Sequence, residues 1–155
     1  MAAYKAQCHI CNYRTKGDQP PVVCEKCGAD LVNPGAEQVL RKAQGSFKPR
    51  DGKIQLGWVF LTNRRLFVVM DSTTQFAALG LVGAAIGAAA NARRASHLAL
   101  NIALTDIADL GEEKVTIAAK GLSILSRTYG PIGAVVVPHR DQWREANMQA
   151  AALAR

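Results

Sequence analysis

The sequence predicts a mainly β protein in which a small cysteine-rich module precedes a larger sheet domain that ends in a helix. All four cysteines of the 155-residue chain fall within residues 8–27. Short apolar runs, alternating or rich in β-branched residues, recur over residues 54–137. Near the C-terminus the apolar residues stand three and four positions apart instead, which is typical of a helix. We therefore expect one domain over residues 1–33 and a second over residues 34–155.

Composition is that of an ordinary globular protein. Hydrophobic residues make up 49% of the chain and charged residues 20%, unlike the composition of disordered or fibrous chains. The formal net charge of +7 excludes an acidic solvating tail and permits anionic partners, which include nucleic acids, acidic lipid headgroups and acidic proteins. The first residues lack the apolar core of a secretory signal, so we expect a cytoplasmic protein with free thiols.

The cysteines form two C-x-x-C pairs, Cys8 with Cys11 and Cys24 with Cys27, and twelve residues separate the pairs. Each pair can place two thiolates on one ion, and two pairs complete the tetrahedral sulfur coordination that zinc prefers. Gly28 allows the backbone to turn tightly behind the second pair. A redox-active dithiol is the alternative interpretation. We expect a structural Zn²⁺ site, because four thiolates leave no open position for catalysis.

The segment around residues 6–32 resembles a zinc ribbon, and these four cysteines with Gly28 behind them are the matching positions. His9 lies inside the first pair and could replace a cysteine as ligand, but we expect it to face solvent. Zinc ribbons serve in nucleic-acid, protein and purely structural contexts, so the resemblance implies the metal and leaves the function open. Four thiolates and one zinc ion would lower the net charge to about +5.

The larger domain follows Asn33-Pro34-Gly35, a segment that breaks regular structure and predicts a linker. Apolar residues then alternate from Ile54 to Phe60, and a tight turn at Asn63-Arg64 leads into the next apolar run. The strands identified by pattern cover residues 54–60, 66–70, 98–104, 115–119, 122–125 and 135–137. The expected total is about seven, with antiparallel neighbours, because most connections are too short for crossover helices.

A helix is expected from about Asp141, which suits the N-cap or the first turn. Trp143, Ala146, Ala150 and Leu153 would form its apolar stripe. A curled sheet or two packed sheets, closed at one end by this helix, would bury both tryptophans of the chain.

The run from Gly57 to Val69 contains Leu-Thr-Asn-Arg-Arg-Leu, which resembles the hairpin of GRAM-like and bacterial pleckstrin-homology-like domains. Ile102–Ile107, Gly121–Ile124 and a helix with Trp143 fit the same order, so the resemblance covers about residues 37–153. It implies a seven-stranded, strongly bent β-sandwich or partly open barrel that a C-terminal helix caps. It also implies binding of membrane lipid or protein rather than catalysis.

Positive charge concentrates early in this domain, where residues 38–65 carry seven basic side chains against Asp51 alone. In pleckstrin-homology-like folds the loop between the first two strands often faces anionic headgroups, and here that loop would span Lys48–Lys53. The candidate lipid or anion contacts are Lys48, Arg50, Lys53, Arg64 and Arg65. A solvated surface that only aids solubility is the alternative.

An Ala/Gly-rich insert occupies residues 75–97, where the resemblance predicts only a loop. Residues 76–90 lack polar side chains, but as a helix they would span about 22 Å, short of a hydrocarbon core of about 30 Å. Close helix packing in an oligomer or against the domain, shallow membrane insertion, and a spanning helix remain open. The candidate contact residues are Phe76, Leu79, Gly80, Gly83 and Gly87.

Together these features predict a bacterial, non-catalytic adaptor that docks at a membrane surface or on a membrane-associated protein complex. We expect a protein partner or a homo-oligomer, peripheral attachment to the inner face of the cell membrane, and no small-molecule substrate. No phosphate-binding glycine loop or nucleophile motif points to an enzyme. A self-assembling protein that uses the insert as its interface and a nucleic-acid-binding zinc-ribbon protein are the alternatives.

Overall fold

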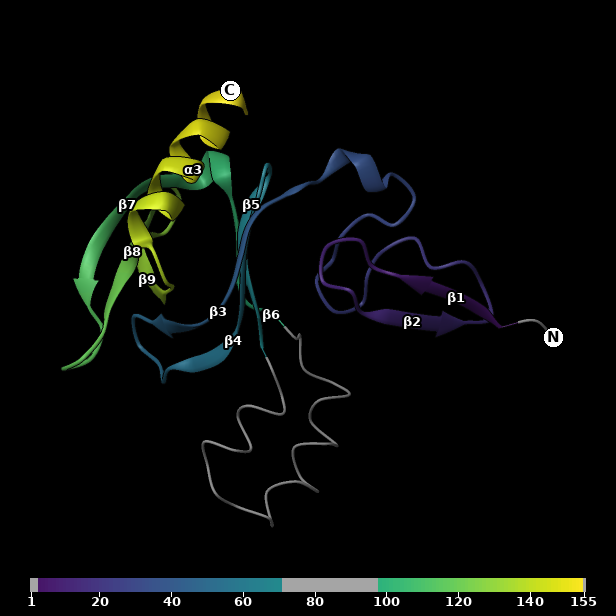
Figure 1. Cartoon of the computed structure of the whole chain (residues 1–155), viewed down its shortest axis with the longest axis horizontal. Helices are drawn as coiled ribbons and strands as arrows, with labels where there is room; N and C mark the ends of the chain where they lie inside the picture. Colours follow the sequence, from purple (N-terminus) through teal and green to yellow (C-terminus); the bar gives the residue numbers. More distant parts are fainter. Residues whose placement is uncertain (1–2, 71–97, 155) are drawn as a thin grey trace, which may run out of the picture.

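Two antiparallel sheets, one small and one large, make up the fold of the computed structural model, which describes residues 3–70 and 98–154 (Figure 1). The small sheet pairs the first two strands, and all later strands belong to the large one. In chain order the elements are β1 (Tyr4–Gln7), β2 (Arg14–Gly17), the 3-10 turn η1 (Pro34–Ala36), β3 (Val39–Pro49), β4 (Gln55–Thr62), β5 (Arg65–Met70), β6 (Leu98–Ala103), the 3-10 turn η2 (Leu104–Asp106), β7 (Ile107–Lys114), β8 (Lys120–Ser126), β9 (Gly130–Val136) and α3 (Arg140–Leu153).

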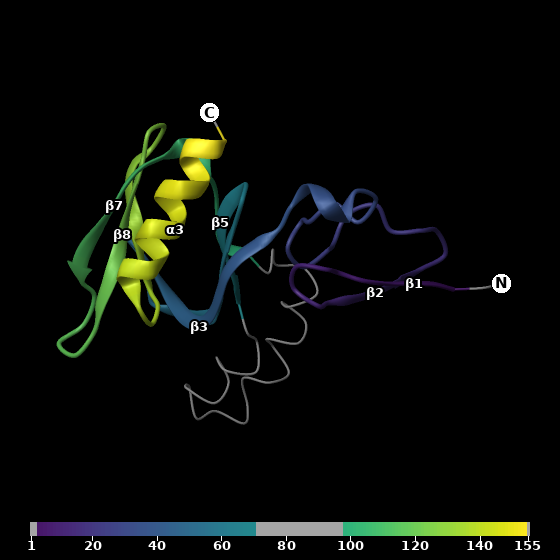
Figure 2. The same ribbon diagram turned by 45° about the horizontal axis from the view of Figure 1, so that its top comes forward.

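The large sheet has the strand order β6-β5-β4-β3-β9-β8-β7, and every pairing is antiparallel. It consists of two meanders that the pairing of β3 with β9 joins. The sheet bends strongly, and α3 lies across its hollow side between the two meanders (Figure 2). The prediction of a mainly β fold with seven antiparallel strands and a terminal helix is confirmed, and the sheet stays open rather than forming a closed barrel.

The main core lies between the bent sheet and α3. Val59 and Leu61 of β4 face it, and Trp143 and Ala150 reach it from the helix. Asp141 stands in the first turn of α3, where its negative charge suits the positive end of the helix dipole. The predicted apolar stripe of α3 is wrong at Leu153, which is 89% exposed because the helix end extends past the sheet.

A second apolar cluster forms on the opposite face of the sheet, under the cysteine-rich module. Phe60 and Phe67 are directly opposite each other on β4 and β5, and their rings stack with centroids 4.9 Å apart. The prediction that both tryptophans are buried is wrong for Trp58, which is 38% exposed. Trp58 shares the outer face with Phe60 and has the Lys42 ammonium group 4.9 Å from its ring centroid. The alternation in β4 did not reveal that Trp58 is exposed, because apolar residues occupy both faces of this strand.

Three further boundaries differ from the prediction. The strand expected at residues 115–119 is a turn, closed by the Val115 amide donating to the Ala119 carbonyl. The strand β7 comes earlier and includes the acidic residues Asp109, Glu112 and Glu113. An edge strand with one face in solvent accommodates such charges. The predicted linker contains the short turn η1.

The insert at residues 75–97, with Phe76, Leu79, Gly80, Gly83 and Gly87, lies outside the described residues. Within residues 3–70 and 98–154, no helix has the length and apolar character needed to cross a bilayer.

Candidate metal centre and basic surfaces

The two C-x-x-C pairs form turns with the same backbone geometry. In the first, the Cys8 amide donates to the Tyr13 carbonyl and the Asn12 amide donates to the Cys8 carbonyl. In the second, Cys24 bonds in the same way with Ala29 and Gly28. Asn12 and Gly28 hold the same position, four residues after the first cysteine of each turn, and have φ angles of 60° and 73°. Asn and Gly are the residues that adopt this left-handed conformation most readily, which explains why they stand there.

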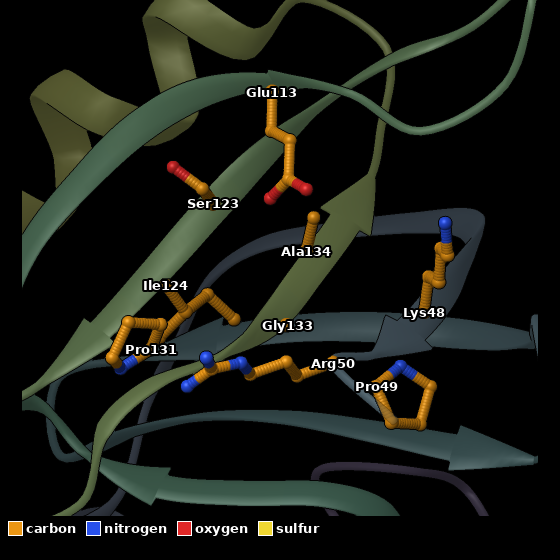
Figure 3. Close-up of a pocket in the computed structure, with 9 residues that line it drawn as sticks. All are labelled: Lys48, Pro49, Arg50, Glu113, Ser123, Ile124, Pro131, Gly133 and Ala134. Carbon is orange, nitrogen blue, oxygen red and sulfur yellow. The ribbon is translucent and has the colours of Figure 1, made fainter. Parts of the chain in front are cut away.

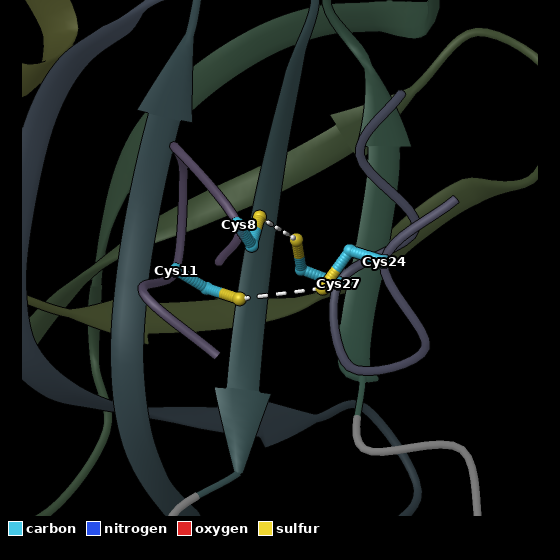
Figure 4. A group of neighbouring side chains, drawn as sticks. All are labelled: Cys8, Cys11, Cys24 and Cys27. Atoms are coloured by element: carbon cyan, nitrogen blue, oxygen red, sulfur yellow. Dashed lines mark hydrogen bonds between the residues drawn. The ribbon is translucent and has the colours of Figure 1, made fainter. Parts of the chain in front are cut away.

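The four cysteine sulfurs converge on one point (Figure 4). All four lie within 4.8 Å of one another, and the closest pairs are Cys8 with Cys27 and Cys11 with Cys24, both 3.6 Å apart. A tetrahedral zinc ion with Zn–S bonds of about 2.3 Å would separate its sulfurs by about 3.8 Å. The spacing and the donor set therefore fit one zinc ion, and the predicted ligands Cys8, Cys11, Cys24 and Cys27 are the residues brought together.

The short distances between the sulfurs shift the pKa values of Cys11, Cys24 and Cys27. The hydrogen bond between the Cys11 and Cys24 sulfurs raises the pKa of Cys11 to about 12 and holds the pKa of Cys24 far below its ordinary value. Contacts with both neighbouring thiols, Cys11 first, raise the pKa of Cys27. Four sulfurs this close cannot all be ionised without a cation between them, because like charges at this distance repel strongly. A divalent cation bound between the sulfurs would offset this repulsion.

The metal centre packs directly against the large sheet. Cys8, Cys24 and Cys27 are buried in one cluster with Phe60 and Phe67 of the sheet. Ile10 and Leu31 add apolar contacts from the cysteine-rich module. Burying this outer face of the sheet stabilises the fold by roughly 25 cal/mol per Å² of apolar area removed from water. The module therefore serves as a cover for the sheet, which the sequence did not indicate.

Arg65 of β5 links the second cysteine turn to the sheet. Its Nη1 donates to the Cys27 carbonyl at 2.6 Å, and its Nε donates to Glu37 Oε1 at 2.7 Å. Glu37 also accepts from the Thr62 hydroxyl, and the guanidinium carbon lies 4.3 Å from the Phe67 ring centroid. Arg65, one of the predicted anion contacts, is thus occupied by internal partners, with only 13% of its side chain exposed.

The other predicted anion contacts lie at two ends of the sheet. Lys48, near the end of β3, and Arg50, at the start of the β3–β4 turn, line a hollow of about 270 Å³, which Glu113 of β7 also lines (Figure 3). Lys53 is exposed in the same turn. Arg64 is exposed at the β4–β5 turn, the length of β4 away, which is roughly 25 Å for eight residues. The structure therefore brings together Lys48, Arg50 and Lys53 and separates them from Arg64.

Two groups of residues were not predicted from the sequence, namely Glu37 and the basic residues of the β1–β2 hairpin. Glu37 follows the linker as an isolated acid, and nothing local marks it as the partner of a residue 28 positions later. The basic residues of the first hairpin, by contrast, do carry a local signal. Lys5 and Gln7 are two positions apart, as are Arg14 and Lys16, so each pair lies on one face of its strand.

Comparison with known proteins adds information on the fold alone. No family model matches the chain, and no curated protein matches its sequence. A solved structure, the C-terminal domain of an unknown protein from Leishmania infantum, aligns with 79% of this chain and 91% of that domain at a TM-score of 0.52. The two sequences are 15% identical, so the similarity concerns the arrangement of the backbone.

Proposed function

We propose that this protein is a non-catalytic, zinc-stabilised adaptor whose large sheet docks at an anionic membrane surface through its β3–β4 turn. Seven antiparallel strands followed by a C-terminal helix support the pleckstrin-homology-like or GRAM-like assignment. In that fold the loop between the first two strands often faces lipid headgroups, and here it is the loop between β3 and β4.

One observation carries the proposal. Lys48, Arg50 and Lys53 lie within six consecutive positions around one turn, and none of them forms an ion pair within the described part of the chain. Asp51 is the single acid in that turn, and Glu113 faces the neighbouring hollow. The turn therefore presents a net positive charge to solvent.

The expected affinity is weak. Each basic residue near an anionic bilayer contributes about 1 kcal/mol, so three contribute about 3 kcal/mol, or roughly a 150-fold enrichment at the surface. Stable attachment needs a second contact. We propose two sources for this second contact. One is the apolar residues of the insert at 75–97, and the other is a protein partner in a membrane-associated complex.

Vesicle flotation tests the proposal. The zinc-loaded chain should float with vesicles that contain phosphatidylglycerol at low salt. Lys48→Gln, Arg50→Gln and Lys53→Gln together should abolish the salt-sensitive part of the binding. The matched control removes three charges elsewhere, with Lys114→Gln, Lys120→Gln and Arg127→Gln. Equal effects of the two triple variants, or no flotation of the original chain, would contradict membrane docking.

A further inference from the structure

A second basic surface lies on the β1–β2 hairpin, outside the β3–β4 turn. The register pairs Lys5 with Lys16 and Gln7 with Arg14, directly across the two strands. Because side chains alternate along a strand, these four residues share one face of the hairpin. All four are exposed, and they line a hollow of about 350 Å³ that extends over the hairpin. The face carries three positive charges and no acid.

The other face of the hairpin is partly covered, at Ala6 and Thr15 but not at Tyr4, which is 49% exposed. Thr15 is buried, and its hydroxyl donates to the carbonyl of Ala6, the residue directly opposite. The basic face is therefore the one on which every side chain is exposed. The first cysteine turn, with Cys8 and Cys11, connects the two strands, since β1 ends at Gln7 and β2 begins at Arg14. The basic face is therefore directly continuous with the candidate metal centre.

The charges on this face lack internal partners. Within the described residues, Lys5, Arg14 and Lys16 form no ion pair and no side-chain hydrogen bond. Two lysines directly opposite each other on neighbouring strands repel and destabilise the hairpin. An anion that contacts both lysines would turn this repulsion into attraction. The opposed lysines therefore destabilise the free hairpin, and they would strengthen a complex with an anionic ligand.

We propose that this face of the β1–β2 hairpin docks in the major groove of duplex DNA. The major groove admits a two-stranded β-ribbon, and the hairpin is a ribbon at the end of the molecule far from α3 (Figure 1). Lysines suit contacts to phosphate oxygens, whereas Arg and Gln are the side chains that bond guanine and adenine edges in two places. Lys5 and Lys16 would hold the backbone, and Gln7 and Arg14 would face the bases.

Charge and polarity favour DNA over a membrane at this face. The four side chains include no apolar group that could enter a bilayer, whereas binding to a polyanion needs only cations and hydrogen-bond donors. The proposal does not depend on membrane docking, because it uses different residues at a different part of the molecule. An adaptor with both surfaces would hold DNA through the hairpin and a bilayer through the β3–β4 turn.

The test is fluorescence anisotropy of a labelled 20-base-pair mixed-sequence DNA duplex titrated with the zinc-loaded full chain. With two phosphate contacts, from Lys5 and Lys16, we expect a Kd between about 1 and 100 µM and a slope of log K against log salt near −1.8. Binding should weaken roughly 12-fold between 50 and 200 mM salt. Binding without salt dependence, or no binding at 50 mM salt, would overturn the proposal.

Matched lysine pairs make the test specific. Lys5→Gln with Lys16→Gln should reduce the magnitude of the slope by about 1.8. Lys114→Gln with Lys120→Gln removes another directly opposed pair, on β7 and β8, and should leave DNA binding unchanged. Arg14→Lys keeps the charge, so it should keep the salt slope while it reduces discrimination between duplexes of different sequence. Equal losses from the two lysine pairs would overturn the assignment of this face.

The competing ligand is tested in parallel. The DNA proposal fails if the original chain does not bind DNA and the double variant with Lys5→Gln and Lys16→Gln no longer floats with vesicles. That result would show that the hairpin binds lipid. If the original chain binds DNA but does not float with vesicles, the DNA proposal stands and membrane docking fails. Zinc content and circular dichroism of each variant confirm that the hairpin is still folded.

Discussion

The Nη1 of Arg65 donates a hydrogen bond of 2.6 Å to the backbone carbonyl of Cys27. A side chain of the large sheet thus contacts the second cysteine turn of the metal centre. The same guanidinium pairs with Glu37 and covers the Phe67 ring, so the contact is supported on three sides. The candidate metal centre and the sheet are therefore in direct contact, although the sequence pattern indicates two independent modules.

Removing Arg65 should destabilise the whole protein. Arg65→Met would leave the Glu37 carboxylate, which is 8% exposed, without its cation, and breaking such a pair costs about 3 kcal/mol. Urea denaturation should show a lower free energy of unfolding. The control is Arg64→Met, because Arg64 is exposed and its loss should change stability by less than about 0.5 kcal/mol. Similar midpoints for the two variants would show that the Arg65 contacts contribute little.

Zinc removal should uncover the outer face of the sheet. We expect one zinc ion per chain by elemental analysis, and its removal by a chelator should unfold the cysteine turns. Phe60 and Phe67 would then lose their cover, so binding of the dye ANS should rise while the β signal of the large sheet persists. Cys24→Ser should reproduce this state without chelator. A zinc content of zero or two ions per chain would refute the assigned centre.

Asp106 should make stability depend on pH at the acid end. Its carboxylate accepts hydrogen bonds from the Thr128 hydroxyl, the Thr128 amide and the Ser126 hydroxyl, which hold the pKa of Asp106 below its ordinary value of 3.8. A pKa lowered by folding stabilises the folded state above the unfolded pKa, and this contribution is lost as pH falls through the folded pKa. The stability difference between the original chain and Asp106→Asn should therefore be constant above about pH 5 and shrink below about pH 4. Urea denaturation from pH 3 to pH 7 measures it, and a constant difference would contradict the assignment.

Gly133 should tolerate no side chain. Its φ of 149° is rarely adopted by other residues, and a Cβ there would collide with the Lys48 carbonyl oxygen on the neighbouring strand β3. Gly133→Ala should cost about 1–3 kcal/mol, because β9 and β3 would have to move apart. Gly35→Ala adds the same methyl group where no atom lies within 4 Å, and it should be nearly neutral. Thermal denaturation compares the two, and equal melting temperatures would show that the β3–β9 contact can adjust.

Local patterns predicted much of the fold. Ligand spacing is a short-range property, so the two C-x-x-C pairs were sufficient to identify Cys8, Cys11, Cys24 and Cys27 as one site. Alternation located most strands, because burial on one face of a strand shows up at every second residue. Alternation did not locate β7, and in β4 it located the strand but did not reveal that Trp58 is exposed. The strand β4 is covered on both faces, and β7 is an edge strand whose charges resemble those of a loop.

The sequence by itself determined the metal-binding pattern, the mainly β class and the terminal helix, because each follows from residues close together in the chain. Only the tertiary structure decided which face of the sheet the cysteine module covers, that Arg65 faces inward to Glu37, and that Lys5 stands opposite Lys16. Some of these facts depend on contacts between residues far apart in the chain, such as Cys27 and Arg65, which are 38 positions apart. Such contacts form only when the burial of apolar surface outweighs the entropy of ordering the chain, and no local pattern records which distant partners achieve this.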